Sequence, residues 1–230
     1  MRKKSSTTPD RSERTLDVYL LPTTTWEQAL LIQQRLVYEL SEEPRRRAAL
    51  ILGEHFPVIT VGRQGSRRHI FVDDDELRSR RIDVHWTNRG GGCWLQCPGQ
   101  LAAYPILPLD PSHMGLEAYR NRLYQVLLDV LEEFRIPAVR DFDAGGVAAS
   151  GREIASVGIA VKNWVAYHGC RLNVCVPLHL FDCVQSNPRL ERPMTCMFRE
   201  LRTPVQVASV RESFLRCFTA AMGFRNYYLC

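Results

Sequence analysis

Residues 152–176 read REIASVGIAVKNWVAYHGCRLNVCV, a mostly apolar run that is too long for one strand. Strands in globular proteins usually span about 3–10 residues, so we expect this run to bend or form a hairpin near Lys162-Asn163. The segment before it, residues 145–150 (GGVAAS), reads as a short strand, and Ser150-Gly151 reads as the turn of a further hairpin. These residues predict antiparallel β-structure in the C-terminal half of the chain.

Further strands and helices are predicted outside this run. Apolar or alternating stretches with β-branched residues predict strands at 16–22, 48–55, 56–62, 83–87 and 101–109. The prolines of the last stretch indicate a strand at a sheet edge. Apolar residues at helical spacing predict helices at 26–40, 116–134 and 207–222. Because helices and strands do not alternate regularly, we expect an α+β fold with mixed or antiparallel sheets and packed helices.

The composition is that of a globular protein, with 230 residues of which 45% are hydrophobic and 24% charged. It rules out a fully disordered chain. No apolar run reaches the roughly 20 residues that a membrane-spanning helix needs, and no secretory signal opens the sequence, so we expect a cytoplasmic protein. We assign residues 1–15 to a flexible basic tail and 16–230 to one domain. The formal net charge of +5 favours acidic partners.

Eight cysteines leave four alternatives: a disulfide framework, a metal site, a nucleophile or packing residues. They are Cys93, Cys97, Cys170, Cys175, Cys183, Cys196, Cys217 and Cys230. Without an export signal, this number does not imply disulfides. The two closest pairs lack the CxxC spacing of zinc ligands, and no second tight Cys/His pair accompanies them, so we expect no metal site. Most of these thiols read as small buried hydrophobic residues.

A glycine run follows the predicted strand at 83–87. Residues 89–92 (RGGG) are followed by the triplet Pro98-Gly99-Gln100. Glycine lets a backbone approach a ligand closely, but neither the GxGxxG nor the GxxxxGK[ST] nucleotide-binding pattern is present. Composition alone therefore leaves two readings open, a flexible hairpin loop or a loop that contacts a ligand.

Four blocks of sequence carry a resemblance to a known family. They are EHFPVITVGR (54–63), RGGGCWLQCPGQLAAYPILPL (89–109), REIASVGIAVKNWVAYHGCRLNV (152–174) and MTCM (194–197). In this order they resemble the lipoate-biosynthesis octanoyltransferases, which belong to the superfamily of biotin and lipoate ligases. The resemblance implies a biotin/lipoate ligase-like fold and the transfer of an octanoyl group from acyl carrier protein to a lysine of a lipoyl domain. It also implies a monomer that needs no cofactor, no nucleic acid and no membrane.

Three positions of the family's chemistry have changed in this sequence. In the family, the octanoyl group passes through a cysteine thioester, and a lysine at the start of a K-I-A-x-I-G strand lowers the pKa of the thiol. Glu153 stands where the lysine is expected, and Asn187, eight residues before Thr195, stands where the cysteine is expected. An asparagine amide is not an acyl nucleophile, and a glutamate beside a thiol would raise the pKa of that thiol. In the glycine loop, Gln96 replaces the family's histidine.

The resemblance also implies which residues bind substrate. They are Arg89, Gly90, Gly91, Gly92, Cys93, Trp94, Leu95, Gln96, Ser156, Val157, Gly158, Gly169, Cys170 and Arg171. Cys97, in the same loop, is the candidate for a substitute nucleophile, with Glu153 as a base acting through a water or His168 as a second possible base. The alternative is that Cys97 only fills the pocket, and Cys183 and Cys196 read as packing thiols.

Two functions from different classes remain open. One is the family's acyl transfer, run with relocated groups. The other is that of a non-catalytic pseudoenzyme that binds an octanoylated carrier or a lipoyl domain. An adenylating ligase is disfavoured, because that branch of the superfamily needs a lysine near the ligand carbonyl and none matches in this sequence.

Overall fold

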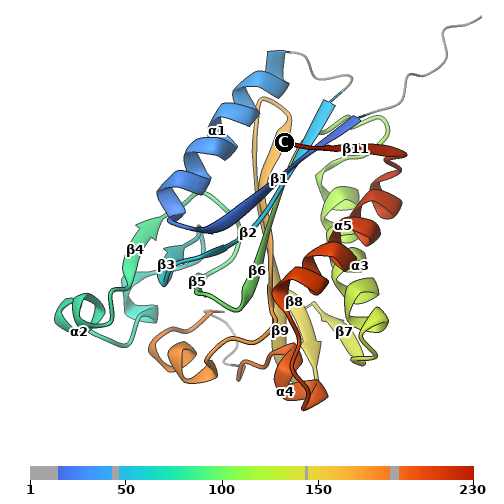
Figure 1. The fold of residues 1–230 in the computed structure, drawn as a ribbon. Coiled ribbons are helices and arrows are strands. Elements are labelled where there is room, and N and C mark those ends of the chain that lie inside the picture. The colour runs from blue at the N-terminus through green and yellow to red at the C-terminus, as the bar shows by residue number, and fades with distance from the viewer. Residues whose placement is uncertain (1–14, 43–46, 143–144, 187–191) are drawn as a thin grey trace, which may run out of the picture.

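A large mixed β-sheet forms the centre of the molecule in the computed structural model, which describes residues 15–42, 47–142, 145–186 and 192–230 (Figure 1). The strand order is β11-β1-β2-β6-β10-β9-β8-β7. The strands span Asn226–Leu229 (β11), Thr15–Thr24 (β1), Arg47–His55 (β2), Gln100–Pro108 (β6), Val165–Asn173 (β10), Arg152–Lys162 (β9), Gly146–Ala149 (β8) and Ala138–Asp141 (β7). β1 pairs in parallel with β2 and β11, and the other neighbours pair antiparallel. The expected α+β fold with a mixed sheet is confirmed.

A second sheet of three strands has the order β4-β3-β5. Its strands span Asp83–Trp86 (β4), Val58–Val61 (β3) and Cys93–Gln96 (β5), and the short helix α2 (Asp74–Ser79) precedes β4. Ile59 and Leu95 of this sheet pack with Phe181 of the short helix η2 (Leu178–Cys183). The chain passes from β5 directly into β6, so the small sheet is joined to the middle of the large one.

Helices cover both faces of the large sheet (Figure 1). On one face, α1 (Trp26–Glu42) buries Ala29, Leu36 and Leu40 in a core shared with β2, β6 and β10. On the other face, α3 (Leu116–Glu133) and α5 (Val207–Met222) pack against each other and against the sheet. The three predicted helices are confirmed. Each forms because it carries one apolar stripe that it can bury against the sheet. The short helix α4 (Met197–Leu201) follows the MTCM block.

The long apolar run forms the expected hairpin of β9 and β10. Between these two strands, Asn163 and Trp164 have positive φ values of 51° and 60°. Ser150 and Gly151, which join β8 to β9, also have positive φ values, of 50° and 74°. Two-residue hairpin turns require such values. β8, β9 and β10 therefore follow one another as antiparallel neighbours.

The expectation that residues 101–109 form an edge strand is wrong, because β6 lies between β2 and β10. Pro105 has no N–H to donate, and the pairing of β6 with β10 is interrupted at residues 167–169, where His168 has a φ of 57°. Gly169 makes the space for the ring, since a Cβ at this position would lie 2.6 Å from Pro105 Cδ. An irregularity in the neighbouring strand thus lets a proline lie inside the sheet.

At both ends of the described chain, the structure contains strand residues that the sequence did not predict. Thr15, the last residue of the expected tail, is the first residue of β1, and residues 1–14 lie outside the described part of the chain. Residues 226–229 form β11, which the sequence pattern did not predict and which extends the sheet beside β1. Among the helices that the structure describes, none has the length and apolar character needed to cross a membrane.

Candidate functional site

The candidate site is built around a buried ion pair between β9 and β10. Arg171 Nη2 lies 3.2 Å from Glu153 Oε1, and the two side chains are 1% and 6% exposed. Ser156 stands opposite Arg171 in the strand pairing, and its hydroxyl donates to Glu153 and accepts a 3.1 Å hydrogen bond from Arg171 Nε. Buried charges are tolerated only when they are paired and hydrogen-bonded. These three side chains meet that requirement as one polar cluster.

A β-bulge explains how Glu153 and Ser156 reach the same side of β9. Side chains alternate along a strand, so residues three apart normally face opposite sides of the sheet. The register between β8 and β9 shifts at Val147 and Ala148, where Ile154 is the extra residue of β9. Such an insertion re-aims the side chains that precede it. The bulge therefore turns Glu153 toward the guanidinium of β10.

Arg171 connects the ion pair to two other segments. Its Nη1 donates to the carbonyl oxygen of Leu95 in β5 at 2.6 Å, and its Nη2 donates to Ser186 Oγ at 3.1 Å. Burial lowers the pKa of Arg171, while the Glu153 carboxylate acts in the opposite direction. One guanidinium thus joins the large sheet, the small sheet and the segment that follows η2.

Trp94 lies between two buried guanidinium groups. The Cζ atoms of Arg89 and Arg171 are 3.8 Å and 5.1 Å from its ring centroid. Arg89 Nη2 donates to the carbonyl oxygen of Thr60 at 2.6 Å and to its hydroxyl at 2.9 Å. Burial lowers the pKa of Arg89 well below its ordinary value, and the nearby charge of Arg171 adds to this effect. The indole face stabilises both cations.

The glycine loop packs against β9. The Gly90 N–H donates to the carbonyl oxygen of Ile159 at 3.0 Å. A Cβ on Gly158 would lie 2.7 Å from the carbonyl oxygen of Gly90 and 2.7 Å from a ring carbon of Trp94, so this close approach requires glycine. The loop and the strand motifs therefore meet in one buried layer around Trp94.

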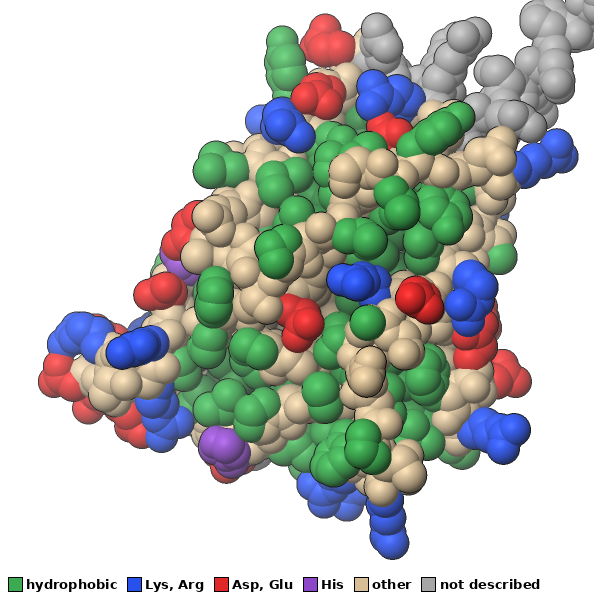
Figure 2. Space-filling model, viewed as in Figure 1, with side chains coloured by type: hydrophobic (Ala, Val, Ile, Leu, Met, Phe, Trp, Pro, Cys, Tyr) green, Lys and Arg blue, Asp and Glu red, His purple; other side chains and the backbone are tan. Residues whose placement is uncertain are grey.

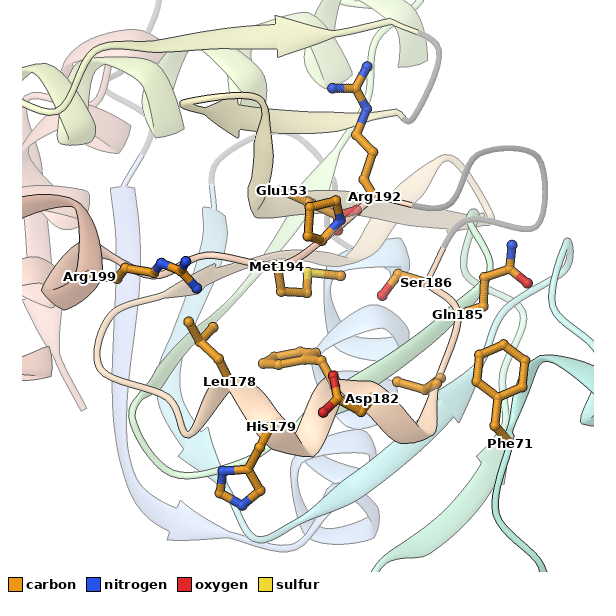
Figure 3. A pocket seen from close by; sticks show the side chains of 13 residues that line it. Phe71, Glu153, Leu178, His179, Asp182, Gln185, Ser186, Arg192, Met194 and Arg199 are labelled. Carbon is orange, nitrogen blue, oxygen red and sulfur yellow. The ribbon is translucent and has the colours of Figure 1, made fainter.

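A cavity of about 570 Å³ lies next to this layer, and Glu153 is one of its lining residues (Figure 3). The volume lies within the range of small-molecule sites. The apolar lining residues are Phe71, Leu178, Phe181, Val184, Pro193 and Met194. The polar and charged lining residues are Glu153, His179, Asp182, Gln185, Ser186, Arg192 and Arg199. Figure 3 shows Met194 and Ser186 near the middle of this space, with Phe71 and Gln185 to one side.

The comparison with known families decides the assignment. Residues 26–219 match the model of the lipoyl protein ligase A/B catalytic domain. The chain belongs to the lipoyl protein ligase A/B family. An octanoyltransferase of Nitratidesulfovibrio vulgaris (strain DP4) is 35% identical over 172 residues, which cover 74% of this chain and 79% of the relative. An octanoyltransferase of Caldicellulosiruptor bescii is 31% identical over 210 residues, covering 90% and 92%.

Solved structures share the fold of this lipoyl protein ligase A/B family member at low sequence identity. A lipoate protein ligase of Thermoplasma acidophilum with bound lipoic acid matches with a TM-score of 0.72 and 15% identity, covering 95% of this chain and 90% of that one. A biotin protein ligase from Aquifex aeolicus in complex with biotin and ATP matches with a TM-score of 0.54 and 13% identity, covering 90% and 70%. The biotin/lipoate ligase-like fold is therefore confirmed.

In this family member, the expected site residues are spread over the cavity, the buried layer and two hydrophobic cores. Within the described ranges, Glu153 is the one expected site residue that lines the cavity. The layer around Trp94 contains Arg89, Gly90, Gly91, Ser156, Gly158 and Arg171. Val157 and Cys170 instead pack in the core shared with α3 and α5, and Cys93 and Leu95 pack in the core of the small sheet. Asn187, which the resemblance places at the position of the family's cysteine, lies outside the described residues.

Cys97 is buried in the core of the small sheet, together with Leu95 and Phe181. Burial raises the pKa of its thiol to about 11. A cysteine nucleophile needs a lowered pKa and access to the substrate, and Cys97 does not line the cavity. All eight cysteines are free thiols, and within the described part of the chain no cluster of His, Cys, Asp or Glu is placed to hold a metal ion.

His168 contacts Trp26 of α1 and Asn88, which precedes the glycine loop. Its ring stacks on Trp26 with centroids 5.7 Å apart, and its Nε2 lies 3.1 Å from Asn88 Oδ1. Burial lowers the pKa of His168 to about 3. Gln96, which the resemblance places at the position of the family's histidine, accepts a 3.0 Å hydrogen bond from the Tyr104 hydroxyl. These contacts give His168 and Gln96 structural partners.

Sequence reasoning missed two features of the site. The first is the partnership of Glu153 with Arg171, which the resemblance placed only among the substrate-binding residues. An arginine in a strand of apolar residues was a usable signal, because buried arginines need a partner. The second is Ser186, which the sequence does not distinguish from any other loop serine.

Proposed function

We propose that the protein transfers an octanoyl group from acyl carrier protein to a lysine of a lipoyl domain. The observation that supports this function best is the cavity of about 570 Å³ beside Glu153. Its apolar residues suit an acyl chain, and its polar residues suit the thioester end. The same scaffold belongs to octanoyltransferases that are 31% and 35% identical to this chain.

Basic side chains near the cavity suit an acidic carrier protein. Arg192 and Arg199 line the cavity. Figure 2 shows basic side chains, coloured blue, at the lower edge of the molecule. Positive charge beside a binding cleft raises the encounter rate with an acidic partner.

The proposed transfer does not form a thioester on a cysteine of the cavity. The described residues that line the cavity include no cysteine. Position 153 carries a carboxylate that Arg171 neutralises, in place of a lysine that would activate a thiol. Acyl transfer must therefore use an oxygen of the site or a direct attack by the acceptor lysine.

A second candidate function is favoured by the closed ion pair. Glu153 and Arg171 satisfy each other inside the protein, which is also what a site that only binds its ligand would show. Such a protein would hold an octanoylated carrier or a lipoyl domain without catalysing transfer.

One experiment separates the two functions. The purified protein is incubated with octanoyl-acyl carrier protein and a lipoyl domain, and the intact mass of the lipoyl domain is followed. We expect a gain of one octanoyl group, and no gain when the acceptor lysine of the lipoyl domain is changed to arginine. Measurable binding of the octanoylated carrier with an unchanged lipoyl domain would overturn the transfer function and support the second candidate.

The cavity itself can be tested by filling it. Met194→Trp places a larger side chain in the space that Figure 3 shows at its centre. We expect octanoyl transfer to fall at least about tenfold, the equivalent of about 1.4 kcal/mol of lost binding. Leu31→Trp is the matched control, because Leu31 is exposed on α1. Equal transfer by both variants would show that the acyl chain binds elsewhere.

A further inference from the structure

We propose that Ser186 is the acyl-accepting residue of this site, and that the octanoyl group rests on its hydroxyl as an oxygen ester during transfer. This inference rests on the proposed function, since it names the group that replaces a cysteine. Arg171 holds the serine oxygen, and Glu153 receives its proton. The three residues come from β9, β10 and the segment that follows η2.

Ser186 is chemically distinct among the residues around the cavity. Of the described lining residues, it carries the one hydroxyl, and none of them carries a thiol. Its side chain is half-buried, so it faces the cavity without being closed off from it. A hydroxyl is the oxygen counterpart of the family's thiol in nucleophilic catalysis.

The guanidinium of Arg171 is aimed at this hydroxyl. Arg171 Nη2 donates to Ser186 Oγ at 3.1 Å from a side chain that is 1% exposed. A charged donor on the attacking oxygen stabilises the negative charge that develops there, and burial strengthens this effect because water does not screen it. Arg171 is therefore positioned to activate Ser186 as an adjacent lysine would activate a thiol.

The Glu153 carboxylate completes the group. Arg171 Nη2 contacts both Glu153 Oε1, at 3.2 Å, and Ser186 Oγ, so the two oxygens share one nitrogen. Glu153 also lines the cavity. A base that lies within hydrogen-bond reach, directly or through one water, can accept a proton from a nucleophile.

The chemical step balances without any further reactant. The Ser186 oxygen attacks the carbonyl carbon of the octanoyl thioester, the new C–O bond forms, and the C–S bond to the carrier breaks. The hydroxyl proton passes to Glu153 and then to the departing sulfur. The amine of the acceptor lysine next attacks the ester carbonyl, forming an amide while its proton returns to the serine oxygen.

Ser156 is the competing hydroxyl in the same cluster, and its surroundings differ. It is 4% exposed, donates to Glu153 and accepts from Arg171 Nε. It does not line the cavity. The Ser156 oxygen is therefore enclosed by the Glu153–Arg171 ion pair. Ser186 contacts the same ion pair but also lines the cavity.

The test is acyl-enzyme trapping with octanoyl-acyl carrier protein in the absence of a lipoyl domain. We expect an octanoyl adduct on the peptide that contains Ser186, stable to neutral hydroxylamine as oxygen esters are. Ser186→Ala should remove the adduct and slow transfer at least about a hundredfold, the scale on which covalent catalysis contributes. Ser186→Cys should give an adduct that neutral hydroxylamine cleaves. Ser112→Ala, an exposed loop serine away from the site, should match the native protein.

Each outcome decides between the two proposals. Native transfer rates in Ser186→Ala, or an adduct on another residue, would overturn the role of Ser186 and leave the proposed function standing. An adduct on Ser186 with no onward transfer to a lipoyl domain would support Ser186 and overturn the transfer function. Neither adduct nor transfer would overturn both.

Discussion

Glu153 and Arg171 depend on each other for charge compensation inside the protein. Each side chain is buried, and each is the counter-charge of the other at 3.2 Å. A buried ion pair adds little net stability when both members are present, but the loss of one member leaves an uncompensated charge. Glu153, which stands where the resemblance implies a lysine, is therefore tied to the arginine on the neighbouring strand.

Replacing Arg171 should show that Glu153 depends on it. Arg171→Ala is expected to lower the free energy of unfolding by about 3–5 kcal/mol, because Glu153 stays buried without its partner. Urea denaturation measures the loss. The paired change Glu153→Gln with Arg171→Met removes both charges and should cost much less. An equal loss in the two variants would mean that the charge pairing is not what stabilises this layer.

Restoring the family's lysine should fail unless the arginine is also changed. Glu153→Lys puts two cations together in a buried site, and we expect a lower melting temperature than that of the native protein. Adding Arg171→Ala to Glu153→Lys removes the repulsion and should recover most of the loss. Only in that double background do we expect Asn187→Cys to yield an octanoyl thioester, measured as a hydroxylamine-sensitive adduct. A stable, active Glu153→Lys/Asn187→Cys variant with Arg171 intact would refute this dependence.

At the scale of elements, strand irregularities position the site. The bulge at Ile154 turns Glu153 toward β10, and the interruption at residues 167–169 accommodates Pro105 inside the sheet. Bulges of this kind re-aim side chains next to functional sites. The pairing within the β9–β10 hairpin is continuous, and the irregularities lie where β9 pairs with β8 and where β10 pairs with β6.

Gly169 should be intolerant of any side chain. A Cβ at this position would lie 2.3 Å from the carbonyl oxygen of Ala103 and 2.6 Å from Pro105 Cδ. We expect Gly169→Ala to cost about 1–3 kcal/mol of stability through overpacking. Gly115→Ala is the control, because a Cβ there meets nothing within 4 Å. Chemical denaturation of both variants measures the difference, and a similar stability for the two would contradict the close approach.

Local sequence patterns predicted most of the helices and strands, but they did not predict contacts between residues that are far apart in the sequence. The stripe of α3 and the turn at Asn163 follow from periodicity and turn chemistry, which act over a few residues. β11 depends on pairing with β1 at the other end of the chain, so no local pattern indicated it. The partner of Glu153 depends on the extra residue Ile154, and a bulge leaves no mark in an apolar strand sequence.

At the scale of the whole molecule, buried histidines couple stability to pH. Burial lowers the pKa of His55 to about 4 and that of His168 to about 3, from an ordinary value of 6.5. Between pH 6.5 and these values the unfolded chain binds protons that the folded protein does not, so stability is full above pH 6.5 and falls as the pH decreases. The slope is about 1.4 kcal/mol per pH unit for each histidine.

Replacing each of the two histidines should reduce the pH dependence of the free energy of unfolding. His168→Asn, which suits the positive φ at this position, is expected to reduce the pH dependence of unfolding between pH 6 and 4.5 by about one proton. Adding His55→Gln should remove about one more. Urea midpoints measured across this range provide the slopes. Unchanged slopes in both variants would show that these rings are protonated in the folded protein.

In the proposed function, this molecule keeps the octanoyltransferase scaffold and transfers the acyl group without a thiol. The most direct measurement is the time course of octanoylation of a lipoyl domain by the native protein and by Cys97→Ala, followed by intact mass. We expect both proteins to transfer the octanoyl group at the same rate, because Cys97 is buried away from the cavity. Transfer that disappears in Cys97→Ala, while the variant remains folded, would contradict it.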